Sequence, residues 1–105
     1  MNEYEVFFRP RARKDLIALY RYIAKRSGLR IAGGYIFRIE KLCLSLASLP
    51  ERGTAISGRA PSLRTMGFER RATILFKVGN ERVEILRILY GGQNLEPVIE
   101  KLQEG

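Results

Sequence analysis

The chain has 105 residues, and its 19 Lys and Arg residues against 11 Asp and Glu residues give it a formal charge of +8. A chain of this length forms one domain that buries roughly two-thirds of the surface its unfolded form exposes, so residues 1–105 are expected to be a single domain. With 46% hydrophobic and 29% charged residues, the composition excludes a disordered tail. No apolar run approaches the ~20 residues needed to cross a bilayer, and residues 1–10 lack the apolar block of a secretory signal. We therefore expect a cytoplasmic protein without a membrane partner.

The sequence contains a single cysteine, Cys43, and no histidine. Zinc sites and acid–base catalysis near neutral pH depend largely on these two residue types, so we expect no metal and no cofactor. One thiol cannot form an intrachain disulfide, and its place in an apolar stripe predicts a buried structural residue. A hydrolase of this composition would have to use Arg, Lys, Tyr, Glu or Asp alone.

Positive charge is concentrated in two windows of the sequence. Residues 9–30 hold eight Lys and Arg residues against one acid, and residues 52–77 hold six against one, which gives +7 and +5. The remainder of the chain carries −4. Such segregation favours an anionic partner, whether a nucleic acid, an acidic protein segment or a phosphorylated ligand. The alternative is an unselective solubilising surface.

The first half of the chain predicts a strand followed by two helices. Tyr4–Phe8 is aromatic and β-branched, and Pro10 directly after it favours a helix start. Apolar residues then recur at helical spacing until Ser27-Gly28, where the glycine favours a helix end. A second amphipathic helix is predicted from about Arg30 to Ser48. The short link between the helices makes them an antiparallel hairpin.

The first predicted helix carries a ridge of basic residues, Lys14, Arg21 and Lys25, opposite its apolar stripe. At 100° per residue these three side chains fall within about 20° of one another. A nucleic-acid-binding module that uses this ridge is one functional hypothesis, and it predicts a steep salt dependence of binding.

The second half of the chain predicts a loop and then a sheet. The stretch up to Pro61 is rich in Gly, Ser and Pro, which predicts a surface loop that leaves Arg52 and Arg59 in solvent. Strand character begins at Leu63 and includes two apolar runs on either side of Gly79-Asn80. That dipeptide is a type II′ hairpin signal. After the last strand, residues 95–102 form a short helix or a tail.

A two-residue loop at Gly79-Asn80 would set the register of this hairpin. The facing pairs on the helix-covered side are then Phe76 with Val83, Ile74 with Ile85 and Ala72 with Arg87. The apolar residues on the opposite side are Leu75, Leu86, Ile88 and Tyr90. Because these four are mixed with charged residues, that side is too apolar for solvent and too charged for a core, so we expect a partner to cover it. A modest exposed apolar patch is the alternative.

The order of elements predicts an α+β fold: an N-terminal strand, an antiparallel helical hairpin, and a mainly antiparallel three-stranded meander that forms one sheet packed on the helices. Four short strings accompany this order, namely VFFRPRARKDLIALYRYIA, SLASLPERG, SLR at Leu63 and Arg64, and VEILRILYGG. In order and spacing they resemble the ParE branch of the RelE/ParE toxins of type II toxin–antitoxin modules, over nearly the whole chain.

The resemblance implies a compact toxin that a cognate ParD-like antitoxin with an acidic C-terminal tail holds inactive, in a module of the plasmid-stabilisation kind. ParE-like members are thought to poison DNA gyrase. RelE-like members instead cleave mRNA in the ribosome with Arg and Lys side chains, which include an Arg on the third strand and a basic residue plus a Tyr near the C-terminus. The two branches therefore make different predictions for the same chain.

Aligned by strand pattern, the third-strand Arg of the ribonucleases falls near Thr73, and their C-terminal basic residue falls near Gly92 or Gln93. None of these residues stabilises a pentacoordinate phosphate as a guanidinium does. The incomplete set favours a non-enzymatic gyrase inhibitor. The alternative, a metal-independent, ribosome-dependent endoribonuclease, stays open because a shift of one or two residues brings Arg70 or Arg71 into play. Many ParE-like members also carry basic residues where Gly92 and Gln93 stand.

Candidate contact residues follow from the resemblance and the strand pattern. Those for the target are Arg64, Arg71, Arg87 and Tyr90, grouped at the late-strand end of the sheet. Those for the antitoxin are Leu75, Leu86, Ile88 and Tyr90 for its apolar anchors, and Lys14, Arg21 and Lys25 for its carboxylates. Arg87 has a structural alternative, an ion pair with Glu69 or Glu84, and Arg64 and Arg71 have the alternative of plain surface charges. Direct binding of nucleic acid is the less favoured option.

Overall fold

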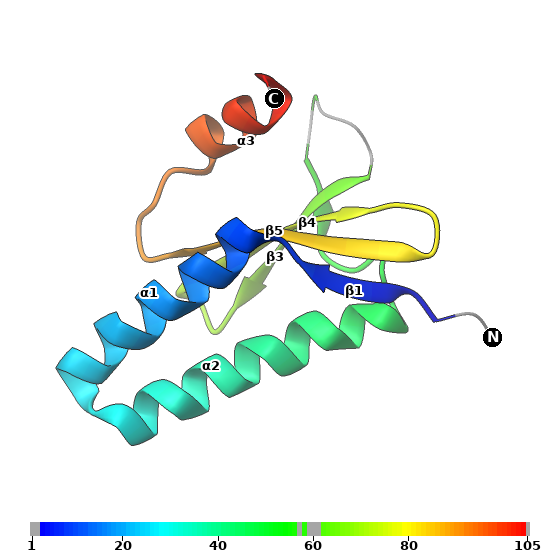
Figure 1. The fold of residues 1–105 in the computed structure, drawn as a ribbon. Coiled ribbons are helices and arrows are strands. Elements are labelled where there is room, and N and C mark those ends of the chain that lie inside the picture. Colours follow the sequence, from blue (N-terminus) through cyan, green and yellow to red (C-terminus); the bar gives the residue numbers. More distant parts are fainter. Residues whose placement is uncertain (1–2, 57, 59–61, 105) are drawn as a thin grey trace.

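The computed structural model describes residues 3–56, 58 and 62–104, so Arg59 of the predicted loop lies outside the described residues. In chain order the elements are β1 (Glu5–Phe8), α1 (Pro10–Ser27), α2 (Leu29–Leu44), a 3₁₀ turn η1 (Ser45–Ala47), β2 (Thr54–Ala55), β3 (Leu63–Phe68), β4 (Ala72–Val78), β5 (Arg82–Tyr90) and α3 (Leu95–Glu104). Figure 1 shows their arrangement. Within the described ranges, no helix combines the length and the apolarity that a membrane span requires.

The strands form one five-stranded sheet in the order β1-β5-β4-β3-β2. The meander β3-β4-β5 is antiparallel, whereas β1 pairs in parallel with β5, placing the first strand beside the last (Figure 1). This confirms the predicted α+β fold. The sequence did not predict β2, whose two residues lie inside the expected loop and pair with β3.

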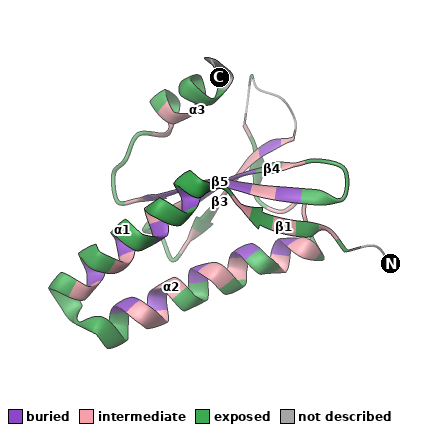
Figure 2. Cartoon of the chain, viewed as in Figure 1, coloured by how far each residue is buried: buried purple, intermediate pink, exposed green. Residues whose placement is uncertain are grey.

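The helical hairpin covers one face of this sheet and supplies half of the main core. Its buried residues are Ala12, Leu16, Leu19 and Ile23 of α1 and Ala32, Tyr35, Ile39 and Cys43 of α2. They pack against Ile74, Phe76, Val83, Ile85 and Ile88 of the sheet. Figure 2 shows buried and exposed residues alternating along both helices. The stripe predicted from helical spacing is thus the stripe that the sheet covers, and the ridge of Lys14, Arg21 and Lys25 is exposed.

The register of the β4-β5 hairpin differs from the predicted one. The Gly79 N–H donates to the Arg82 carbonyl at 2.8 Å, and the positive φ of the turn, 59°, belongs to Glu81. The observed pairs are Phe76 with Ile85, Ile74 with Ile88 and Ala72 with Tyr90, with an irregularity between Leu75 and Phe76 that leaves Leu86 as an extra residue. The predicted register would have placed Arg87 opposite Ala72 on the core face. Burial decides the register, because the bulge turns Ile85 and Ile88 to the helices together.

The bulge also divides the four apolar residues that were predicted to share the other face. Ile88 belongs to the main core and Tyr90 packs against it, on the helix side. Leu75 and Leu86 lie on the opposite side in a second cluster with Leu63 and Ile99. Helix α3 brings Ile99 to that face, so the chain covers Leu75 with its own C-terminal segment (Figure 1). The prediction of one mixed face left open for a partner was therefore wrong.

Candidate functional site

Arg87 forms a nearly buried ion pair with Asp15 of α1. Its Nε and Nη2 donate to the two carboxylate oxygens at 2.7 and 3.1 Å, and the Ile88 N–H donates to the same carboxylate at 2.9 Å. The two side chains are 12% and 11% exposed. The alternative prediction that Arg87 forms a structural ion pair with a carboxylate is confirmed, but the partner is Asp15, not Glu69 or Glu84. The guanidinium is therefore engaged inside the protein.

Arg64 holds the segment that enters β2. Its guanidinium donates to the main-chain carbonyls of Glu51, Arg52 and Gly53 at 3.0, 2.9 and 3.2 Å. Arg52, which was expected in solvent, is half-buried and donates to the Ser45 hydroxyl at 2.7 Å. These contacts tie the loop to β3 and give Arg64 a structural role, while its role in target binding stays a prediction.

The four predicted target residues do not form one group. Arg64 stands near the start of β3 and Arg71 follows its end, so the two lie at opposite ends of that strand. Arg87 lies against α1 through Asp15. Only Arg71 and Tyr90 come together, in a pocket at the end of the sheet next to the helical hairpin. The expected cluster at the late-strand end is thus reduced to this pair.

The pocket that joins Arg71 and Tyr90 has a volume of about 410 Å³. It is lined by Tyr22, Ile23, Arg26, Ser27, Ile31, Tyr35, Glu69, Arg71 and Tyr90. Because its residues come from both helices, the β3-β4 turn and the end of β5, it exists only in the folded protein. We call it the tyrosine pocket.

Three tyrosine rings form one side of the tyrosine pocket. The Tyr90 ring meets the Tyr22 ring edge-on at 5.7 Å between centroids and the Tyr35 ring at 6.0 Å. Arg26 stacks over Tyr22 at 4.6 Å from the ring centroid, and Arg38 lies over Tyr35 at 5.5 Å. Edge-to-face rings and stacked guanidinium groups fix one another's orientation. The arrangement is a preformed aromatic surface with positive charge beside it.

Two groups of the tyrosine pocket have shifted pKa values. Burial is the main cause that raises the pKa of the Tyr35 hydroxyl, which is buried and has no hydrogen-bond partner among the described residues. Arg38 donates two hydrogen bonds to Glu69, at 2.8 and 3.1 Å, and this holds the pKa of the Glu69 carboxyl below its usual range. Of the residues that line the pocket, Glu69 is the one carboxylate, and a lowered pKa makes it a weak general base.

The positions aligned with the ribonuclease residues hold no cation. Thr73 pairs with Leu89 inside the sheet, and the side-chain oxygen of Gln93 accepts the Tyr90 N–H at 2.9 Å. Arg71, one of the two residues that a shifted alignment would bring into play, does share the tyrosine pocket with Tyr90. Within the described part of the chain, no group of three or more His, Cys, Asp or Glu side chains is placed to hold a metal ion.

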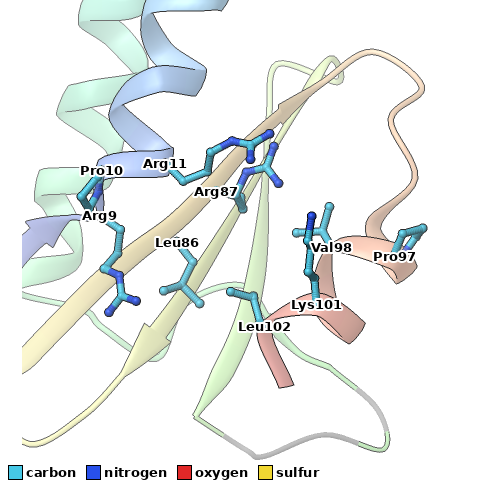
Figure 3. A pocket seen from close by; sticks show the side chains of 9 residues that line it. All are labelled: Arg9, Pro10, Arg11, Leu86, Arg87, Pro97, Val98, Lys101 and Leu102. Carbon is cyan, nitrogen blue, oxygen red and sulfur yellow. The ribbon is translucent and has the colours of Figure 1, made fainter. Parts of the chain in front are cut away.

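A second pocket, of about 450 Å³, lies where α1, β5 and α3 meet. Figure 3 shows the side chains that line it: Arg9, Pro10, Arg11, Leu86, Arg87, Pro97, Val98, Lys101 and Leu102. Arg9 is paired with Glu84 at 2.8 Å, so part of its positive charge is already balanced. This pocket contains Leu86, a predicted antitoxin anchor, against the inner side of α3.

The sequence did not predict the apolar surface on the outside of the helical hairpin. Ile17, Phe37 and Leu44 expose more than half of their side chains there. Two neighbouring grooves, of about 310 and 350 Å³, include these residues and share Arg13 and Glu40 on their borders. One sequence signal could have indicated this surface. Ile17 directly follows Leu16 of the buried stripe and therefore lies on a side of the helix that is exposed to water in a monomer.

The comparisons with known proteins agree with the predicted family. The sequence profile described as "ParE toxin of type II toxin-antitoxin system, parDE" matches residues 6–95. Toxin ParE3 of Caulobacter vibrioides is 32% identical over 87 residues, which cover 83% of this chain and 86% of that protein.

Two solved structures share the fold. The chromosomal ParDE TA system from P. aeruginosa matches with a TM-score of 0.73 at 23% identity, covering 85% of this chain and 97% of that one. The toxin–antitoxin complex RelBE2 from Mycobacterium tuberculosis matches with a TM-score of 0.60 at 22% identity, covering 89% and 97%. The sequence match over most of the chain and the relative above 30% identity together show common descent with the ParE toxins. The chain therefore belongs to the ParE family of toxins of type II toxin–antitoxin systems.

Proposed function

We propose that this ParE-family toxin inhibits DNA gyrase by binding, without catalysing a reaction, and that a cognate antitoxin neutralises it. The observation that carries the proposal is the match of residues 6–95 to the ParE branch of the superfamily. The fold likeness is consistent with this, because the TM-score is higher for the ParDE structure, 0.73, than for RelBE2, 0.60.

The chemistry of the tyrosine pocket supports a binding role over a catalytic one. Cleavage of RNA without a metal needs cations around the phosphate and a group that takes or gives a proton. Thr73 and Gln93 stand where the ribonuclease branch has cations, and the Gln93 side chain is occupied by the Tyr90 N–H. Glu69 has a lowered pKa and is held by Arg38.

The antitoxin is proposed to dock on the outside of the helical hairpin. Ile17 lies three residues after Lys14 and four before Arg21 on α1, so an exposed apolar residue lies directly beside the basic ridge. An antitoxin segment with apolar anchors and carboxylates fits this pattern. The two structural neighbours, named as a ParDE system and a RelBE2 toxin–antitoxin complex, support such a partner.

The predicted antitoxin anchors on the sheet are less accessible than this surface. Leu75 and Ile88 are buried, and Leu86 lies beneath α3. An antitoxin segment contacts Leu75 and Leu86 only where α3 moves away, whereas Tyr90 is half-exposed at the tyrosine pocket. We therefore assign the first antitoxin contact to the helices. Since gyrase, the proposed target, acts on DNA, the proposed place of action is the cytoplasm.

The function is tested with purified toxin, gyrase and a translation extract. We expect the toxin to block supercoiling and to trap gyrase–DNA cleavage complexes, and the product of the adjacent reading frame to abolish both effects. Arg71→Glu is the informative variant, because only the main chain of Arg71 makes hydrogen bonds among the described residues, whereas Arg64→Glu would break the loop contacts of the Arg64 side chain. Lys77→Glu is the matched control, an exposed cation elsewhere on the sheet.

The second candidate function is a ribosome-dependent endoribonuclease, which the shared location of Arg71 and Tyr90 favours. In the translation extract it predicts mRNA fragments cut at ribosomal positions. Such fragments, without trapped gyrase complexes, would overturn the gyrase proposal and establish the enzyme instead.

A further inference from the structure

The tyrosine pocket combines an aromatic surface with two cations that make no ion pair among the described residues. Its volume of about 410 Å³ lies in the range of small-molecule sites. Tyr22 is 46% exposed and Tyr90 is half-exposed, so ring surface is available to a ligand. A planar ring packed against tyrosines gains stacking energy whatever its hydrogen-bonding groups.

The cations of the pocket are Arg26 and Arg71, which come from the end of α1 and from the turn between β3 and β4. Neither makes an ion pair within the described residues, although Arg26 stacks on Tyr22. Glu69 is the opposing charge, but Arg38 holds both of its oxygens, at 2.8 and 3.1 Å. The pocket thus keeps two guanidinium groups for an anion, and guanidinium groups match the geometry of phosphate.

A third observation concerns Tyr35, which also lines the pocket. Tyr35 is only 8% exposed, and its hydroxyl oxygen is buried without a hydrogen-bond partner among the described residues. A buried polar group without a partner carries a desolvation cost that a ligand oxygen or nitrogen would remove. An aromatic surface, two free cations and an unsatisfied hydroxyl therefore converge on one small volume.

We propose that the tyrosine pocket binds a nucleoside 5′-monophosphate unit. The base lies against Tyr22 and Tyr90, the phosphate is held between Arg26 and Arg71, and the Tyr35 hydroxyl bonds to the ligand. The unit comes either from a free mononucleotide or from the 5′-phosphorylated end of a single strand. This site goes beyond the proposed function, because gyrase inhibition requires no nucleotide on the toxin.

The test measures binding by calorimetry and by chemical-shift changes in NMR spectra. The probes are adenosine 5′-monophosphate, adenosine, ribose 5-phosphate, and a short single-stranded oligonucleotide with and without its 5′-phosphate. We expect the monophosphate to bind at least about fivefold more tightly than adenosine or ribose 5-phosphate, because base and phosphate each contribute. A preference for the 5′-phosphorylated oligonucleotide assigns a strand end as the source, and a preference for the mononucleotide assigns the free ligand.

Variants in the pocket and matched control variants outside it distinguish binding at this site from non-specific electrostatic binding. Tyr22→Ala and Arg71→Ala are each expected to lower the affinity for the monophosphate about tenfold, and Tyr22→Phe should restore it. Phe37→Ala and Arg21→Ala remove an exposed ring and an exposed cation elsewhere on the helices, and should change the affinity less than twofold.

The inference would be overturned if the wild-type toxin showed no saturable binding of the monophosphate. It would also be overturned if the pocket variants and the control variants lost affinity equally. Gyrase inhibition is measured on the same preparations. A toxin that inhibits gyrase without binding the monophosphate overturns this inference alone, and one that binds it without inhibiting gyrase overturns the proposed function alone.

Discussion

Asp15 and Arg87 lock helix α1 to strand β5. The Asp15 carboxylate accepts two hydrogen bonds from the Arg87 guanidinium and a third from the Ile88 N–H, with both side chains nearly buried. The bulge at Leu86 changes the course of β5 just before Arg87. The ion pair thus fixes the helix at the point where the strand departs from regular pairing.

Removal of Asp15 should strongly destabilise the fold. Asp15→Ala leaves the Arg87 guanidinium and the Ile88 N–H without their acceptor, so we expect the free energy of unfolding to fall by about 3–5 kcal/mol. Urea denaturation at neutral pH measures the change. Arg9→Ala is the control, because its pair with Glu84 is half-exposed and is expected to be worth less than about 1 kcal/mol. A loss for Asp15→Ala no larger than for the control would contradict the role given to this pair.

Tyr35→Phe should leave the protein as stable as before or stabilise it by up to about 1 kcal/mol. The change deletes a buried hydroxyl that has no partner among the described residues and keeps the ring contacts with Phe68 and Tyr90. Thermal unfolding of both proteins is the measurement, with Tyr35→Ala as a control that loses the ring. If Tyr35→Phe is clearly destabilising in the absence of ligand, the hydroxyl has a partner in solution.

Cys43 should make stability fall at alkaline pH. Burial raises the pKa of its thiol from 9.0 to about 12. Below pH 9 the thiol is protonated in both states, whereas between about pH 9 and 12 only the unfolded chain releases the proton, so stability falls by up to about 1.4 kcal/mol per pH unit. Urea titrations of wild type and Cys43→Ala at pH 8, 9 and 10 test this, and the variant should show the shallower decline. Equal slopes would show that the thiol is not shielded.

Helix α3 should detach when Ile99 is shortened. Ile99 is buried against Leu63, Leu75 and Leu86, and Ile99→Ala should cost about 2–5 kcal/mol at that contact. Because the main core lies on the other face of the sheet, we expect the amides of α3 to lose protection from hydrogen exchange while those of α1 keep theirs. Leu102→Ala, at a partly exposed position on the same helix, is the control. Uniform loss of protection across the chain would show that α3 belongs to the global unfolding unit.

The helices were predictable from the sequence because their buried stripes repeat locally. Leu16, Leu19 and Ile23 identify the packed face of α1 whatever covers it. The register of β4 and β5 was not predictable in this way, because the bulge at Leu86 is selected by packing across the sheet. Gly79-Asn80 correctly predicted a turn between the two strands, but the turn extends to Glu81, which has the positive φ. A local rule places a turn, but the core decides its alignment.

The candidate site was predictable only in part for the same reason. Arg71 and Tyr90 were identified as candidates and do share a pocket, but Tyr22 and Tyr35 have no mark in the sequence that distinguishes them from core aromatics. The partner of Arg87 was missed because Asp15 stands 72 positions earlier. Contacts between distant segments require the fold, which the residue pattern gives only in outline.

The parallel pairing of β1 with β5 governs when the toxin completes its fold during synthesis. Strand β1 is synthesised first but cannot pair until β5, which ends at Tyr90, has been synthesised. Until then the apolar stripes of both helices have no sheet to pack against. A nascent chain released only as far as the loop before β3 therefore exposes its hydrophobic surface to the cell. Long-range pairing of this kind slows folding, and it means that the toxin gains its final surface only after nearly the whole chain has left the ribosome.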